Sequence, residues 1–169
     1  MLKLRYANEK DFEAYVKLYV DEDNHILISK GDDASGDEEA IEFFGADFLK
    51  ILEEEYNSNC QFENFKAMLG YKIILVAEID SEIVGFVSLF SCDRQGYKID
   101  DCILVAPQNE ELKEQVIRAV LRFKFPRARR IIVTLLGDEV KEFFEKMGFT
   151  KQDLSGFYEF QIPKQRRGN

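Results

Sequence analysis

A turn between an apolar strand and an amphipathic helix, around Asn109, has residue types suited to binding an anion. Asn109 is a good N-cap, and Glu110 and Glu111 follow in the first helical turn, where the helix dipole favours negative charge. The first backbone N–H groups of a helix have no partner within it and point out of the turn. The pattern therefore predicts an anion site at residues 109–113, with a plain strand–helix packing unit as the alternative.

Two adjacent carboxylates, Asp100 and Asp101, precede the apolar run 103–105 of that strand. They are the best candidates in the chain for accepting a proton, directly or through a water molecule. Alternation along a strand places them on opposite faces, so at most one of them points into a cleft. The alternative is a solvated entry to the strand.

The composition narrows the classes of function. The chain has 169 residues, 46% of them hydrophobic, which favours one globular domain spanning 1–169. A net charge of −9 argues against nucleic-acid binding, and no apolar run approaches the roughly 20 residues of a membrane span. The first residues lack the pattern of a signal peptide, so we expect a cytoplasmic protein.

The number and spacing of cysteines and histidines argue against a disulfide framework and a histidine-built site. Cys60, Cys92 and Cys102 are odd in number and lack CxxC spacing, so a disulfide framework is not expected and a reducing compartment fits. His25 is the only histidine, which makes a histidine-built metal site or a Ser-His-Asp triad improbable. We therefore predict no metal. His25 itself is either a base or, more simply, an exposed loop residue.

Charge is unevenly distributed. Residues 21–55 hold 13 acids and two bases, a local charge of −11. Such a segment is either a solvated loop or a surface that concentrates a cationic ligand. Basic residues gather at the far end of the central helix, where they complement the helix dipole or hold an acidic group; they are Arg118, Arg122, Lys124, Arg127, Arg129 and Arg130.

Hydrophobic periodicity indicates alternating strands and helices. The spacing predicts strands at 2–6, 71–79, 83–90, 99–105, 130–136 and 158–162. It predicts helices at 12–19, 41–56, 110–123 and 140–147, an acidic loop at 21–40, an ambiguous stretch at 57–70 and a frayed tail at 164–169. The short connection 80–82 makes the second and third strands a hairpin.

This order of elements, with its internal hairpin, resembles the GNAT acetyltransferase superfamily. FFEKMGF (143–149) is similar to the aromatic-aromatic-Glu-Lys-Leu-Gly-Phe ending of the family. ILVAP (103–107) is similar to its fourth strand, and EIDSEIVGFVSLF (78–90) to its second-to-third strand hairpin. The resemblance covers most of the chain from residue 71 onward. It implies a mixed-sheet α/β fold, the GNAT acyl-CoA N-acyltransferase fold.

The resemblance also implies a cofactor site. In this family acyl-CoA lies between the splayed fourth and fifth strands, with its pyrophosphate on the helix that follows the fourth strand. Here the pantetheine arm would pair with Ile103, Leu104 and Val105, and the turn with Asn109, Glu110, Glu111, Leu112 and Lys113 would hold the pyrophosphate. Phe144 would line the same cleft, in the place of a tyrosine that often protonates the leaving thiolate.

Three departures from the family pattern bear on activity. The turn QNEELKEQ (108–115) has neither the glycines nor the arginine of the family, Gly137 replaces an asparagine and Phe144 replaces the tyrosine. Tyr158 or Tyr97 could supply the acid instead, although each is also a packing residue. Each carboxylate at 110 and 111 would repel a phosphate by about 1–4 kcal/mol at 4 Å. We therefore expect CoA binding to be weakened.

The resemblance implies an N-acyltransferase that moves an acetyl group from acetyl-CoA to a primary amine. The acceptor would be cationic, a small amine or a Lys-rich peptide, and Asp100 or Asp101 would take its proton. The alternative is a non-catalytic GNAT-fold binding or regulatory module with a degenerate CoA site. The sequence leaves the oligomeric state open, a homodimer included.

Overall fold

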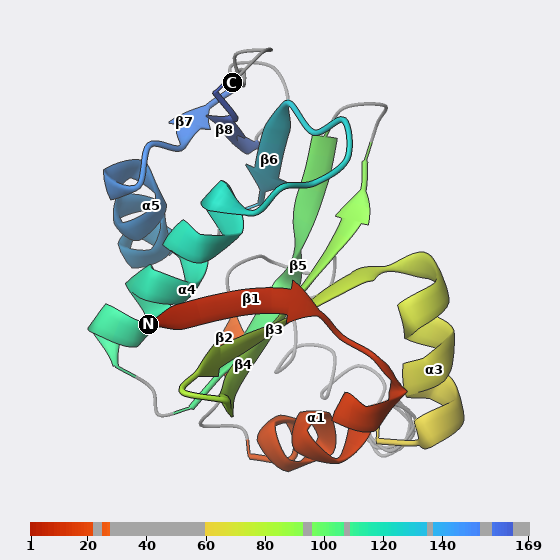
Figure 1. Ribbon diagram of the computed structural model, residues 1–169. Coiled ribbons are helices and arrows are strands. Elements are labelled where there is room, and N and C mark those ends of the chain that lie inside the picture. The colour runs from red at the N-terminus through yellow and green to blue at the C-terminus, as the bar shows by residue number, and fades with distance from the viewer. Residues whose placement is uncertain are drawn as a thin grey trace, which may run out of the picture.

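One mixed sheet organises the computed structural model, which describes residues 1–21, 25–27, 60–92, 96–106, 109–134, 137–152 and 157–163. Eight strands run in the order β1-β3-β4-β5-β6-β8-β7, with β2 paired to β5 (Figure 1). This confirms the predicted mixed α/β class. The strands are β1 (Leu2–Tyr6), β2 (His25–Leu27), β3 (Ile73–Ile79), β4 (Glu82–Ser91), β5 (Gly96–Val105), β6 (Arg130–Val133), β7 (Thr150–Lys151) and β8 (Tyr158–Gln161).

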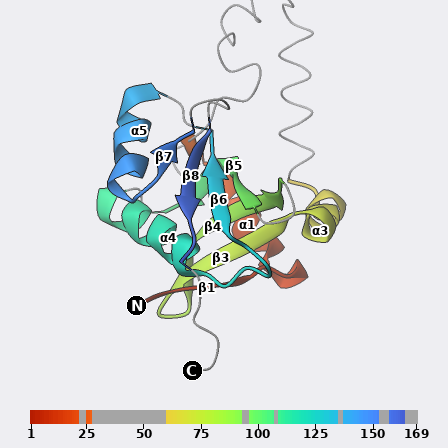
Figure 2. The ribbon, with the colours of Figure 1, turned by 90° about the horizontal axis from the view of Figure 1, so that it is seen from above.

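Helices cover both faces of the sheet (Figures 1 and 2). The main core, which includes Leu75, Val116 and Phe144, lies between the sheet and helices α4 and α5. The second core, which includes Tyr15 and Phe65, lies between the sheet and helices α1 and α3. The described helices are the 3-10 helix η1 (Glu9–Asp11) and the α-helices α1 (Phe12–Tyr19), α3 (Phe62–Tyr71), α4 (Glu110–Arg122) and α5 (Gly137–Lys146).

The predicted hairpin is confirmed. β3 and β4 pair antiparallel, from Ile79 opposite Glu82 to Ile73 opposite Leu89. Asp80 and Ser81 have φ angles of 51° and 67°. Positive φ at both central residues is typical of the two-residue turn whose twist matches that of the flanking strands.

The pairing of β5 with β6 ends partway along β5, and the candidate functional site lies beyond this end. Gly96–Lys98 pair in parallel with β6. Against β4 the register then passes from Leu89 opposite Ile99 to Val87 opposite Ile103, so β4 advances two residues while β5 advances four. Such a bulge bends a strand. Beyond it β5 no longer pairs with β6, so the two parallel strands diverge.

A charged network fixes the start of the chain to the sheet. The Arg5 guanidinium donates to Asp11 Oδ1 at 2.7 Å, to Asp11 Oδ2 at 2.8 Å and to Glu78 Oε1 at 2.7 Å. Asp11 is almost fully buried, and its Oδ2 also accepts from the backbone N–H of Asn8. The hydrogen bonds from Arg5 hold the pKa of Asp11 below its ordinary value.

We expect Asp11→Asn to lower stability by about 1–2 kcal/mol at neutral pH, because it weakens a charged hydrogen bond whose arginine is partly exposed. A carboxyl with a depressed folded-state pKa stabilises the fold above its unfolded-state pKa and loses this effect as the pH falls through the folded-state pKa. Urea unfolding should therefore show the difference between wild type and variant shrinking below about pH 4. Glu9→Gln, in an exposed pair with Lys66, is the control. A difference that is constant with pH would contradict the assignment.

Several predicted segments lie outside the described residues. They include helix 41–56, tail 164–169 and all of loop 21–40 except Asp21 and the short strand β2. The ambiguous stretch 57–70 contains most of α3. Among the described helices none is long and apolar enough to cross a membrane.

Candidate functional site

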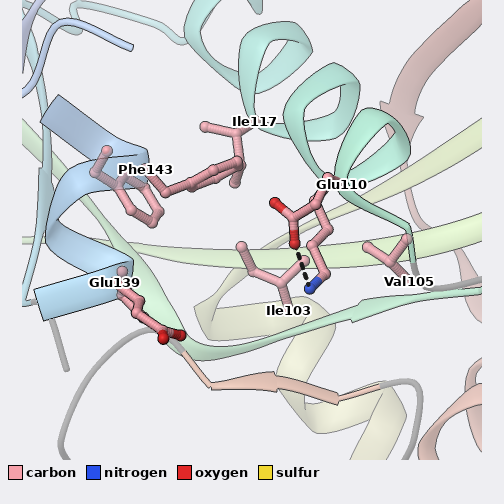
Figure 3. A pocket seen from close by; sticks show the side chains of 9 residues that line it. Ile103, Val105, Glu110, Ile117, Glu139 and Phe143 are labelled. Atoms are coloured by element: carbon pink, nitrogen blue, oxygen red, sulfur yellow. Dashed lines mark hydrogen bonds and ion pairs between the residues drawn. The ribbon is translucent and has the colours of Figure 1, made fainter. Parts of the chain in front are cut away.

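A pocket of about 270 Å³ lies where β5 diverges from β6 (Figure 3). Its walls are mostly apolar and come from one strand and two helices. Figure 3 shows Glu110 on the α4 side and Glu139 on the α5 side. The lining residues are Ile103 and Val105 of β5, Glu110, Lys113 and Ile117 of α4, and Glu139, Val140, Phe143 and Phe144 of α5.

The N-terminus of α4 opens beside this pocket. Asn109 caps the helix as predicted, its Oδ1 accepting from the Leu112 N–H at 2.7 Å. This bond satisfies one of the first free N–H groups. The backbone N–H groups of Glu110 and Glu111 have no acceptor within the helix. Leu112 is buried in the main core, so its side chain contributes packing and its amide serves the cap.

The two carboxylates of the first turn are not equivalent. Glu110 lines the pocket, and its Oε1 lies 3.4 Å from Lys113 Nζ. Glu111 does not line the pocket, and its Oε1 accepts from Gln115 Nε2 at 3.4 Å on the exposed side of the helix. From the sequence we expected both Glu110 and Glu111 to repel a bound phosphate. The geometry leaves that role chiefly to Glu110, which Lys113 partly neutralises.

The predicted strand residues divide between the two faces of the sheet. Ile103 and Val105 face the pocket and the main core, whereas Leu104 packs in the second core. The Ala106 N–H donates to Val84 of β4 at 2.8 Å. In an antiparallel pair, alternate residues direct their backbone groups to opposite edges. The backbone groups of Ile103 and Val105 therefore point to the edge away from β4.

That edge is partly covered by the chain itself. β2 pairs antiparallel with β5, placing His25, Ile26 and Leu27 opposite Leu104, Ile103 and Cys102. β4 takes the other edge of Leu104 and Ile103. β2 therefore occupies part of the edge at which we predicted that strand 103–105 pairs with a pantetheine arm, and this pairing stays a prediction. Of residues 103–105, Val105 lies beyond the described register of β2. No pattern in the sequence predicted this three-residue strand.

The predicted proton-transfer residues lie on β5 and β8. Asp100 and Asp101 lie inside β5, within the predicted strand 99–105 and in its bulged stretch. Their side chains are outside the described part of the structure, and the bulge removes the simple alternation that we assumed for them. Tyr158 is buried in the main core on β8 and does not line the pocket. The Tyr97 hydroxyl donates to the Pro126 carbonyl at 3.2 Å, also outside the pocket lining.

α5 supplies most of the lining that sequence analysis missed. Phe144, a predicted site residue, is fully buried and lines the pocket while packing edge-on against Phe149. Val140 and Phe143 belong to the same amphipathic stripe, so periodicity placed them on the inner face but could not separate core from pocket. Ile117 lies on the inner face of α4, where periodicity likewise could not separate core from pocket. No sequence pattern indicated a role for Glu139.

Comparisons with known proteins identify the fold. No protein-family model matches the chain, and no curated protein resembles it in sequence. A probable acetyltransferase from Staphylococcus epidermidis matches at a TM-score of 0.59 and 16% identity, over 96% of this chain and 100% of that chain. Mutant forms of the spermidine/spermine N-acetyltransferase SpeG from Vibrio cholerae match at 0.60 and 14%, over 95% and 94%. The aminoglycoside acetyltransferase AAC(6')-Ib, in complex with coenzyme A, matches at 0.58 and 14%, over 95% of both chains.

The chain has the GNAT acetyltransferase fold. The match spans almost the whole of each chain, and the diverging parallel strands, the capped helix and the closing helix α5 are present in their expected order. The predicted fold is therefore confirmed. At these identities the similarity describes architecture, and the chemistry depends on the side chains of this chain.

Proposed function

We propose that this protein transfers an acetyl group from acetyl-CoA to a primary amine, with the donor in the pocket between β5, α4 and α5. The observation that carries the proposal is the apolar pocket at the divergence of β5 and β6, beside a capped helix N-terminus. Apolar walls suit an acyl chain, and unpaired helix amides suit a phosphate. AAC(6')-Ib, which has the same fold, holds coenzyme A.

The residues present fit an acyl-CoA in part. Ile103, Val105 and Ile117 would provide apolar contact, and the free amides of Glu110 and Glu111 would bind the pyrophosphate. The Glu110 carboxylate opposes an anion. We therefore propose a weak donor site.

The transfer needs one proton acceptor and one proton donor. The neutral amine attacks the thioester carbonyl, the new N–C bond forms, the C–S bond breaks and the thiolate leaves. The amine proton passes to Asp100 or Asp101, which lie where β5 bends toward the divergence. With no tyrosine at Phe144, the thiolate takes its proton from water, at the cost of the roughly 10²–10⁴-fold that a positioned acid supplies.

β2 must leave its edge of β5 if the pantetheine arm of acyl-CoA is to pair with that edge. The backbone groups of Ile103 point to the edge that β2 occupies. Two partners cannot pair with the same edge at once. The proposed function therefore includes a competition between β2 and the donor, which lowers the apparent affinity by the fraction of molecules with a free edge.

We expect Glu110→Gln to tighten CoA binding by about fivefold, because it removes about 1 kcal/mol of repulsion at an exposed position. It also releases Lys113 from its 3.4 Å ion pair. Glu111→Gln, which removes the same charge from the side away from the pocket, should change affinity less than twofold. Calorimetric titration with CoA measures both. Equal effects, or tighter binding only in the Glu111 variant, would place the pyrophosphate elsewhere.

We propose a cationic acceptor. SpeG acts on spermidine and spermine and AAC(6')-Ib on aminoglycosides, and residues 21–55 of this chain carry a charge of −11. Long-range attraction weakens as the Debye length shortens to about 8 Å at physiological salt. The KM for spermidine should therefore rise with salt, and should lose this dependence when Asp32, Asp33, Asp37, Glu38 and Glu39 are changed to Asn or Gln. A KM that is independent of salt in the wild type would exclude this role.

The alternative is a binding module without catalysis. The turn without glycines, Phe144 and the covered edge of β5 favour it. An assay of acetyl transfer to polyamines and aminoglycosides, run beside CoA titration, separates the two. Binding without turnover on any amine would favour the module, and turnover above the spontaneous rate would favour the transferase.

A further inference from the structure

A second pocket lies at the opposite end of α4. It has a volume of about 300 Å³ and a lining that alternates between cationic and apolar side chains. Its floor is buried or half-buried, and its cationic rim is exposed. The lining residues are Leu121, Arg122, Phe123, Lys124, Phe125, Arg127, Ala128, Arg129, Ile162 and Pro163.

The four cations have no ion-pair partner among the described residues. No carboxylate lines the pocket, and among the described residues no ion pair involves Arg122, Lys124, Arg127 or Arg129. Their neighbours Arg118 and Arg130, by contrast, pair with Glu114 and Glu159. In a chain of net charge −9, four unpaired cations around one hollow form a local site for an anion.

The segment that carries these cations is held in place. The Phe125 ring stacks on Tyr97 with centroids 5.1 Å apart, and Phe123 lies 5.0 Å from Phe125 and 5.3 Å from Tyr6. The Ile162 N–H donates to the Arg129 carbonyl at 2.8 Å, which ties the rim to the end of β8. Packing therefore fixes the aromatic floor of the pocket and the backbone of its rim.

One rim residue sits in a backbone conformation that disfavours it. Residues 125–128 form a turn in which the Ala128 N–H donates to the Phe125 carbonyl, with Pro126 second and Arg127 third. Arg127 has a φ of 56°, and that position of such a turn favours glycine or asparagine. Strained residues of this kind gather at ligand sites. The arginine side chain thus occupies a place where glycine would serve the fold better.

We propose that this pocket is a binding site for a small, multiply phosphorylated ligand. Three of its four cations are arginines, whose planar guanidinium groups bind phosphate oxygens in pairs. The apolar floor would contact the body of the ligand, and the pocket is small enough to favour a metabolite over a peptide. α4 has 13 residues and is about 20 Å long, so this site is separate from the pocket at its N-terminus.

Inorganic pyrophosphate, titrated calorimetrically at physiological salt with acetyl-CoA in excess, tests the proposal. We expect saturable binding at one site. Arg127→Gly should weaken it at least fivefold while leaving the melting temperature unchanged or raised, because glycine relieves the turn. Lys124→Gln should weaken it similarly, and Arg118→Gln, which removes a charge from the same helix outside the pocket, should leave it within twofold.

Three results would overturn the proposal. The first is no saturable binding at millimolar pyrophosphate. The second is an equal loss of affinity in Arg118→Gln and Arg127→Gly, which would indicate diffuse charge rather than a site. The third is tighter binding of citrate than of pyrophosphate, which would assign the pocket to carboxylates. None of these depends on acetyl transfer, so the proposal is tested independently of the proposed function.

Discussion

Replacing Ile26 with proline is expected to tighten acetyl-CoA binding by about 5- to 30-fold. Proline places a residue without an N–H opposite Ile103, on the edge of β5 to which Ile103 directs its backbone groups. Losing this N–H and fitting the proline ring against β5 together cost the pairing of β2 about 1–2 kcal/mol, and acetyl-CoA then binds more tightly by the same free energy. Calorimetric titration of both proteins with acetyl-CoA measures the change.

Ile26→Ala is the matched control, because it keeps the backbone N–H while shortening the side chain. We expect it to bind acetyl-CoA much more like wild type than Ile26→Pro does. Unchanged or weaker affinity in the proline variant, with measurable binding in wild type, would show that the donor does not use the edge of β5. If neither protein binds acetyl-CoA, the proposed function itself fails, so the two failures are distinguishable.

Gly85→Ala is expected to cost about 1–3 kcal/mol of stability, toward the upper end of the range for overpacking. A Cβ at position 85 would lie 2.5 Å from the carbonyl oxygen of Leu104, a backbone atom of the neighbouring strand. β4 and β5 would have to separate, and no side-chain rotation can relieve the contact. The midpoint of urea unfolding should fall accordingly.

Gly70→Ala is expected to change stability in the opposite direction. Gly70 is in α3, and a Cβ there would meet nothing within 4 Å. Alanine in a helix is favoured over glycine by about 0.5–1 kcal/mol, so this variant should be slightly more stable than wild type. A Gly85→Ala protein as stable as wild type would mean that the close approach of β4 to β5 at this point is not tight.

The elements that local sequence determines were predicted well. Asn109 caps α4 where the side-chain pattern indicated, and Gly148, with a φ of 101°, ends α5 with the Phe149 N–H donating to the Phe144 carbonyl. Both features depend on residues a few positions apart in the chain. Their capping preferences can therefore be predicted without knowledge of the tertiary structure. The hairpin at Asp80 and Ser81 belongs to the same class.

The candidate site depends on longer-range pairing and was predicted only in part. The bulge in β5 around Asp100 and Asp101, and the pairing of β2 beside Ile103, arise from register between distant segments. The three residues of β2 lie within an acidic stretch of sequence and are too few to show the alternation that predicts a strand. Likewise, periodicity placed Phe144 on an inner face but could not show that the main core stops there and a pocket begins.

The central claim, that the pocket between β5, α4 and α5 binds acetyl-CoA, is tested most directly by titrating isotope-labelled protein with acetyl-CoA and following its backbone amide resonances. We predict saturable shifts that concentrate at Ile103, Val105, at residues 110–113 of α4 and at the pocket face of α5 around Val140 and Phe144. The amides of β2 should shift as well, because the donor takes its edge. Titration to millimolar acetyl-CoA without saturable shifts at these residues, or with shifts confined to the basic end of α4, would contradict the account.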